Sequence, residues 1–315
     1  MKFLIQTDDN GQVLHDFSKN LIELQKFYDW LYQGNSKDEP IIEINYCCMD
    51  NSETAKLLCL ENYIKCNSYD TDGEPYIYKY TPVGSVEFVR KFAKLAYGTD
   101  YFPKPINVPV QLMPELYSGR ICRNLISGED VYNYFGYVNL HLPLNDKNCN
   151  RFFVKSLDTI KDERNGFYDV IPDLHNGTMT LEARMYNGYQ VHKIFDHRSY
   201  EVFTNCQVST MLDDIESEWR VFVYKGKGVD VKNYSGDPFV FPNADRIYQF
   251  INQYTEAPEA YTLDVAVTNK GTWVLECHDF FSCGLYGSTD KNIPFMLNHA
   301  WFNIKNEILK HKNNG

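Results

Sequence analysis

Two carboxylates in one short stretch are the residues of this sequence that most clearly point to chemistry. Asp264 and Glu276 lie in YTLDVAVTNKGTWVLECHD, residues 261–279. Runs of Val, Leu, Tyr and Trp flank the turn signal TNKG, which predicts a β-hairpin. A three-residue loop ending in glycine, which tolerates positive φ, would pair Thr268 with Thr272. This register sets the two carboxylates opposite each other on one face.

Opposed carboxylates repel each other and destabilise a strand pair. Asp264 and Glu276 therefore need either a proton on one of them or a cation between them. His278 follows on the same face, which completes a candidate platform for a divalent metal. A solvated outer face, where charges are common, explains the hairpin alone equally well.

Two lysines upstream are candidates for binding phosphate. Lys155 ends the apolar run FFVKSL, and Lys161 follows it in a polar turn. A lysine at the end of a buried strand must reach water or an anion, because burying an unpaired ammonium is costly. Two such mobile charges can clamp phosphates. The alternative is a pair of surface lysines whose stems lie along apolar surface.

An arginine and a glutamate share one side of the strand ESEWRVFVY. Alternation along this strand turns Trp219, Val221 and Val223 towards the core and places Glu218 and Arg220 on the other face. A strand arginine beside an acid suits bidentate contact with a phosphate or a carboxylate. An internal salt bridge between Glu218 and Arg220 is the simpler alternative.

The whole chain has the composition of an ordinary globular protein. It has 315 residues, 43% hydrophobic and 23% charged, and a formal net charge of −11 that argues against a nucleic-acid partner. Nine cysteines without framework spacing favour reduced thiols and a cytoplasmic location, which is the host cytoplasm if a phage encodes the protein. The N-terminus reads as a first strand rather than a signal peptide, and no run of 18 apolar residues predicts a membrane span.

The elements that must position these residues fall into two parts. Alternating strands and helices over the first 100 residues predict a small α/β domain, and the proline-rich stretch 101–114 marks its boundary. The expected elements of this first part are strands 1–6 and 40–46, helix 18–32, and helix 85–97, which ends at Gly98. The second part is expected to contain strand 152–157, a loop-rich region 165–188, strand 200–208, a hairpin formed by 219–224 and 229–234, helix 244–254, the carboxylate hairpin and helix 298–312.

The order of these parts resembles the ATP-grasp superfamily, and within it the phage and bacterial clade named for one arginine and two lysines. The matching pieces are FVKSLDTIK, SEWRVFV and YTLDVAV…VLECHDFFSCGLYG, within residues 110–290. The resemblance implies an α+β ATP-grasp fold, in which two lobes grip a nucleotide, behind a small α/β N-terminal domain. The expected boundaries are 1–110 for the N-terminal domain, 111–205 for the first lobe and 206–315 for the second lobe.

The resemblance also implies roles for single residues. Lys155 and Lys161 would contact the nucleotide phosphates, with Glu218 in the same nucleotide site. Arg220 would stabilise the transferred phosphate or an acyl phosphate, so Arg220 and Lys161 are the catalytic candidates.

The adenine and ribose contacts follow from the same resemblance. The strand 206–209, with Gln207, Val208 and Ser209, would be the inter-lobe segment whose backbone hydrogen-bonds adenine. Asp213 is the candidate for the ribose, with its neighbour Asp214 as the alternative.

The metal ligands implied by the resemblance are Asp264, Glu276 and His278. The family pattern has an asparagine two residues after the glutamate, where this sequence has His278, followed by Asp279. Magnesium prefers oxygen ligands and imidazole suits softer metals. The histidine therefore leaves the second metal ion an open question.

The implied function is an ADP-forming, ATP- and Mg²⁺-dependent carboxylate–amine ligase that acts through an acyl phosphate, with an amino acid or peptide as candidate substrate. Two Mg²⁺ ions are expected, with Mn²⁺ as an alternative, and the partners would be ATP, a carboxylate and an amine. The alternatives are a nucleotide-binding protein without ligase activity, a phosphotransferase, and a structural protein with a charged hairpin face.

Overall fold

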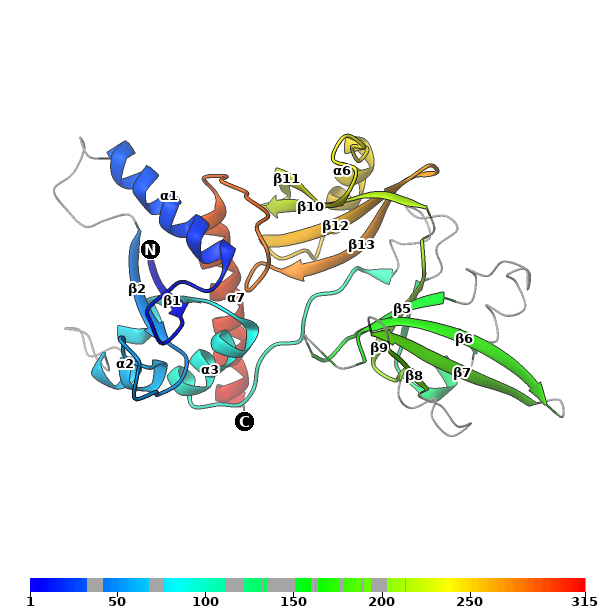
Figure 1. Ribbon diagram of the computed structural model, residues 1–315, viewed down its shortest axis with the longest axis horizontal. Helices are drawn as coiled ribbons and strands as arrows, with labels where there is room; N and C mark the ends of the chain where they lie inside the picture. The colour runs from blue at the N-terminus through cyan, green and yellow to red at the C-terminus, as the bar shows by residue number, and fades with distance from the viewer. Residues whose placement is uncertain are drawn as a thin grey trace.

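The fold is mixed α+β, as expected, with three sheets among the described residues (Figure 1). It is a computed structural model. It describes residues 1–32, 42–67, 76–110, 122–131, 133–134, 151–159, 162, 164–175, 178–187, 190–193, 203–212 and 214–314. No helix in these ranges is long and apolar enough to cross a membrane.

The N-terminal part is a three-stranded parallel sheet of order β2-β1-β3 with helices beside it. Parallel neighbours need crossover connections, and the helices supply them. The elements are β1 (Lys2–Thr7), α1 (Asp16–Tyr32), β2 (Glu43–Cys48), α2 (Leu60–Cys66), the 3₁₀ helix η1 (Tyr76–Lys79), β3 (Tyr80–Val83) and α3 (Val86–Tyr97). The predicted start and end of α3 are confirmed: Ser85 Oγ accepts a hydrogen bond from Phe88 N, and Gly98 is left-handed with φ 69°.

The C-terminal helix α7 (Ile293–Asn314) lies against this N-terminal part (Figure 1). It begins five residues before the predicted start at residue 298. Met296 and Ala300 share one core with Phe3, and Trp301 shares another with Phe92 of α3. Helix α7 therefore buries its apolar face on the N-terminal part.

A six-stranded antiparallel sheet of order β4-β9-β5-β6-β7-β8 follows the linker. Its strands are β4 (Cys122–Leu125), β5 (Arg151–Ser156), β6 (Gly166–His175), β7 (Thr178–Asn187), β8 (Gln190–Lys193) and β9 (Cys206–Thr210). The prediction that 165–188 is loop-rich is wrong, because β6 and β7 pair continuously from Phe167–Tyr186 to His175–Thr178. Pro172 lies within this ladder opposite Leu181, so the glycines and the proline misled the prediction.

The third sheet has the order β11-β10-β12-β13, and α6 covers one of its faces. Its elements are β10 (Ile215–Tyr224), β11 (Lys227–Gly236), α6 (Ala244–Gln253), β12 (Ala260–Thr268) and β13 (Gly271–Asp279). The predicted core face of β10 is confirmed, since Trp219, Val221 and Val223 are buried in one cluster with Phe250 of α6. On the opposite face, Phe222 and Ala260 pack into the core of the N-terminal part, and Arg220 and Asp264 are buried polar residues.

Candidate active site

The carboxylate hairpin has the predicted pairing but reaches it by a different register. Asp264 lies opposite Glu276, as expected. The turn is tighter than expected, because Thr268 pairs with Gly271 and not with the following threonine. A β-bulge at Leu275 then absorbs the one-residue offset before the carboxylates meet. Bulges change the direction of side chains and are common beside functional sites. The bulge at Leu275 therefore helps to place Glu276 opposite Asp264.

Arg220 and Asp264 form a buried ion pair across β10 and β12. Arg220 Nε and Nη2 donate to the two oxygens of Asp264 at 2.8 and 2.7 Å, and the side chains are 7% and 2% exposed. Arg220 Nη1 also donates to Gly284 O at 3.0 Å. Burial by itself lowers the pKa of Arg220, but the bond to Asp264 raises it above its usual value. The predicted alternative, a salt bridge between Glu218 and Arg220, is therefore wrong.

Two tyrosines flank this arginine. The Arg220 guanidinium lies 5.1 Å from the ring centre of Tyr286 and 6.0 Å from that of Tyr234, and the two rings stack at 5.2 Å. Tyr286 has φ 47° beside Gly287 at 76°, and a Cβ on Gly284 would come 3.1 Å from the Tyr286 ring. The backbone of the segment GLYG, residues 284–287, thus positions the Tyr286 ring over the arginine. Tyr234 was missed from sequence, since an isolated strand tyrosine carries no motif.

Glu276, His278 and Asp264 gather their ligand atoms within 4.8 Å of one another. His278 Nε2 lies 2.5 Å from Glu276 Oε1 and 3.9 Å from Asp264 Oδ2. Burial of Glu276 raises its pKa, but the hydrogen bond and charge of His278, with Lys155, bring it down to about 2. Lys155 Nζ donates to Cys277 O at 3.1 Å and lies 3.5 Å from Glu276 Oε2. The glutamate is therefore ionised at neutral pH.

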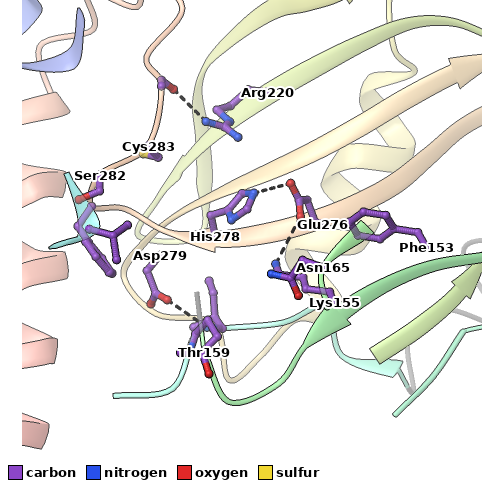
Figure 2. A pocket seen from close by; sticks show the side chains of 15 residues that line it. Phe153, Lys155, Thr159, Asn165, Arg220, Glu276, His278, Asp279, Ser282 and Cys283 are labelled. Carbon is purple, nitrogen blue, oxygen red and sulfur yellow. Dashed lines mark hydrogen bonds and ion pairs between the residues drawn. The ribbon is translucent and has the colours of Figure 1, made fainter. Parts of the chain in front are cut away.

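These groups face a pocket of about 410 Å³ between the two larger sheets and the N-terminal part (Figure 2). It is lined by Val86, Pro105, Ile106, Phe153, Lys155, Thr159, Asn165, Arg220, Glu276, His278, Asp279, Phe281, Ser282, Cys283 and Gly284. Four residues predicted from sequence thus meet here: Lys155, Arg220, Glu276 and His278. Asp264 lies beside them, with both oxygens bonded to Arg220.

A smaller pocket of about 190 Å³, lined mostly by apolar side chains, adjoins the first through Phe153 and Glu276. It is lined by Phe153, Phe167, Met211, Leu212, Ile215, Glu218, Tyr234, Leu275 and Glu276. Glu218, a predicted nucleotide contact, thus lies in this second pocket together with Tyr234. An apolar slot with a polar edge has the character of a small-molecule site.

The predicted adenine-binding strand lies inside a sheet. Gln207, Val208 and Ser209 belong to β9, which pairs with β4 on one side and β5 on the other. The Gln207 amide donates to Val108 O at 2.9 Å and Asn124 Oδ1 at 3.0 Å. The crossing between the two sheets follows β9 directly and begins at Met211 and Leu212.

Two further predicted site residues, Lys161 and Asp213, lie outside the described residues. Asp214, the alternative ribose contact, is exposed with φ 55° at the crossing between the sheets.

The donor set fits a divalent cation. Glu276 and His278 face the pocket, and each carboxylate oxygen of Asp264 keeps a lone pair beyond its bond to Arg220. The two carboxylates suit Mg²⁺ or Mn²⁺, and the imidazole favours Mn²⁺, the softer of the two.

Comparison with known proteins gives one match to a family model. The family model described as ATP-grasp domain, R2K clade family 2, matches residues 180–294, just over a third of the chain. This segment contains Arg220, Asp264, Glu276 and His278, whereas Lys155 precedes it. No curated protein matches the chain.

Solved structures with similarity to the chain include three at low identity. Cdc123 from Schizosaccharomyces pombe has 15% identity and a TM-score of 0.22, covering 27% of this chain and 39% of Cdc123. A RimK domain protein ATP-grasp from Sphaerobacter thermophilus has 11% identity and a TM-score of 0.37, covering 98% and 100%. D-alanyl-alanine synthetase A from Vibrio cholerae has 11% identity and a TM-score of 0.39, covering 98% and 99%. Through the family match, the segment that carries the carboxylate hairpin belongs to the ATP-grasp superfamily.

Proposed function

We propose that the protein is an ATP- and divalent-metal-dependent carboxylate–amine ligase that acts through an acyl phosphate. The main support for the proposal is that charged residues from two different sheets line the same pocket. Lys155 comes from one sheet and Arg220, Glu276 and His278 from another, yet all four line one pocket (Figure 2). A cationic and metal-binding set of this kind suits a triphosphate, whose chemistry depends on positioning and charge stabilisation.

The nucleotide would occupy both adjoining pockets. The small apolar slot suits the flat adenine ring, with Met211 and Leu212 at its wall. These two residues are the first of the connection that leads from β9 to the third sheet. We therefore assign the adenine contacts to them rather than to Gln207, Val208 and Ser209. The phosphates would then extend past Glu276, whose negative charge a bound metal would offset, towards Lys155 in the larger pocket.

The metal would be held by Glu276 and His278, with Asp264 as a further ligand. When bound, such a cation neutralises charge on the phosphate oxygens. Lys155 adds a flexible positive charge at the same place, because its ammonium lies 3.5 Å from Glu276 Oε2.

Arg220 would stabilise the charge that develops on the transferred phosphoryl group. Its guanidinium is held by Asp264, by Gly284 O and by the ring of Tyr286. A donor that is already fixed needs no reorganisation during the reaction, which is where electrostatic stabilisation is most effective.

One alternative is a nucleotide-binding protein without ligase activity. Two observations favour it: His278 stands where the family pattern has asparagine, and Asp264 has both oxygens bonded to Arg220. A phosphotransferase would use the same groups but release a stable phosphorylated product.

A coupled ADP-release screen over mixtures of carboxylates with amino acids, amines and short peptides tests the proposal. We expect ADP only when a correct acid and amine are both present, and we expect Glu276→Gln to abolish its release. Glu216→Gln is the matched control, since Glu216 is an exposed carboxylate on β10. ADP release that is equal in Glu276→Gln and the wild type would contradict the site assignment. ADP release without an amine would favour the phosphotransferase.

A further inference from the structure

We propose that Asp279 binds the ammonium group of the amine substrate, and that this substrate carries an apolar, uncharged substituent beside its amine. The inference rests on the proposed ligase function and extends it to the substrate class. It is drawn from the end of the larger pocket that lies away from the adenine slot.

This distal end of the pocket is built from three separate segments. Ile106 comes from the linker, Val86 from the start of α3, and the stretch 279–284 from the end of β13 and the loop after it. Two hydrogen bonds join the segments: Ile106 N donates to Asp279 Oδ2 at 3.0 Å, and Ser282 Oγ donates to Gly84 O at 2.7 Å. The wall is therefore preorganised by the fold.

Asp279 is the charged group of this distal end, where Figure 2 shows it apart from Glu276. Its neighbour in the lining, Ile106, supplies a backbone N–H. No lysine, arginine or histidine in the described part of the chain forms an ion pair with Asp279. Asp279 is half-buried, and a carboxylate with one neutral donor retains lone pairs for a charged partner. An ammonium group is the partner that fits, and the proposed reaction requires an amine in this pocket.

The remaining lining of the distal end is uncharged. It consists of Val86, Pro105, Ile106, Phe281, Ser282 and Cys283. A free amino acid bound through its ammonium would bury its own carboxylate here without a cation, which is costly. An amine, an amino acid amide or the N-terminus of a peptide avoids this cost.

Two nearby cations could overturn this conclusion. Lys155 lines the same pocket and its charge acts on Asp279, but its ammonium donates to Cys277 O at 3.1 Å and lies 3.5 Å from Glu276 Oε2. The other cation is Arg90. It lies one helical turn after Val86 on α3, but its guanidinium is placed over the ring of Phe102, at 5.4 Å. It is not part of the pocket lining. An amino acid carboxylate could reach it only if this contact opened.

Direct binding tests the inference without knowledge of the acid substrate. The probes are leucinamide, leucine and 4-methylpentanamide, which share an apolar chain and differ in the ammonium and carboxylate groups. We expect calorimetry to show leucinamide binding at least about tenfold more tightly than the other two, because 4-methylpentanamide lacks the ammonium group and leucine would bury its own carboxylate.

The variant Asp279→Asn should remove the preference for leucinamide over 4-methylpentanamide, because its amide oxygen can still accept from Ile106 N but carries no charge. Glu256→Gln, an exposed carboxylate on the adjoining surface, should leave the preference unchanged. If Asp279→Asn fails to fold, the relative affinities of the wild type for the three probes still test the inference.

Equal binding of leucine and leucinamide, or binding of leucine that is lost in Arg90→Gln, would overturn the inference. ATP binding measured on the same samples separates the two proposals. A preference for leucinamide without ATP binding would overturn the proposed ligase function. ATP binding without a preference for leucinamide would overturn only the proposed role of Asp279.

Discussion

The buried pair of Arg220 and Asp264 allows a stability change to be worked out from the structure. Asp264→Asn keeps the shape of the side chain but leaves the guanidinium, 7% exposed, without its bidentate partner. Two unit charges about 4 Å apart interact by roughly 4 kcal/mol at an effective dielectric constant of about 20. Glu276 also acts on Arg220 and compensates in part. We therefore expect the free energy of unfolding to fall by about 3 kcal/mol, at the lower end of the range for a broken buried pair.

The exposed pair of Lys26 and Glu23 is the matched control. Its 2.8 Å contact is as short, but its side chains are 66% and 67% exposed. Glu23→Gln should therefore change the free energy of unfolding by less than about 0.5 kcal/mol. The double variant Arg220→Met, Asp264→Leu should regain most of the loss, because an apolar pair leaves no buried charge uncompensated.

Urea unfolding followed by tryptophan fluorescence measures these differences, since Trp219 is buried next to Arg220 on β10. A loss below about 1 kcal/mol for Asp264→Asn, comparable to an exposed pair, would refute the reasoning. So would a double variant that is less stable than Asp264→Asn, since the missing charge partner would then not be the cause of the loss.

Three further predictions follow from single contacts. Gly236→Ala should destabilise the fold far more than Gly226→Ala in thermal unfolding: both glycines are left-handed, at φ 73° and 71°, but a Cβ on Gly236 would meet the backbone oxygen of Glu216 whereas nothing lies near Gly226. Equal losses would show that only the backbone conformation matters, at about 1–2 kcal/mol. The depressed pKa of Glu276, about 2 against a usual 4.5, stabilises the fold above pH 4.5, and this contribution is lost as the pH falls towards 2. Acid unfolding of Glu276→Gln should therefore have a shallower pH dependence than that of the wild type, and parallel curves would contradict the prediction. Lys155→Met should weaken ATP binding about tenfold in calorimetry, in line with a charge-assisted contact, while Lys227→Met, at an exposed position, should not; equal effects would indicate only a general loss of positive charge.

The strands of the third sheet could be predicted because the alternation of apolar and polar residues and the turn residues indicate the same strands. Alternation in β10 identified its core face, and the opposition of Asp264 and Glu276 was correct even though the turn was assigned the wrong length. Two offsets cancelled: the tighter turn moved the register by one residue, and the bulge at Leu275 moved it back. A bulge is decided by packing and has no local sequence signal here.

The six-stranded sheet was harder to predict. The pairing of β6 with β7 places Pro172 inside a ladder, where a proline argues against a strand. The Asn-Gly dipeptide at residues 176–177 was the hairpin signal that deserved more weight. The adenine segment was placed in β9 because order along the chain does not reveal which strand is flanked on both sides.

Some parts of the site depend on contacts between distant segments. Asp279 joins the linker through Ile106, and Arg220 gains Tyr286 and Tyr234 as ring neighbours. None of these pairings follows from spacing along the chain. Motifs therefore identified the charged centre, while the fold was needed to show what surrounds it.

Calorimetric titration with ATP, in the presence and absence of Mg²⁺, tests most directly whether this pocket is a nucleotide–metal site. The wild type should bind one ATP per chain when Mg²⁺ is present. Glu276→Gln should weaken this binding at least about tenfold, since it removes a charged ligand, while Glu216→Gln should not. Absence of binding, or ATP binding that neither Mg²⁺ nor Glu276→Gln affects, would contradict the assignment of the pocket.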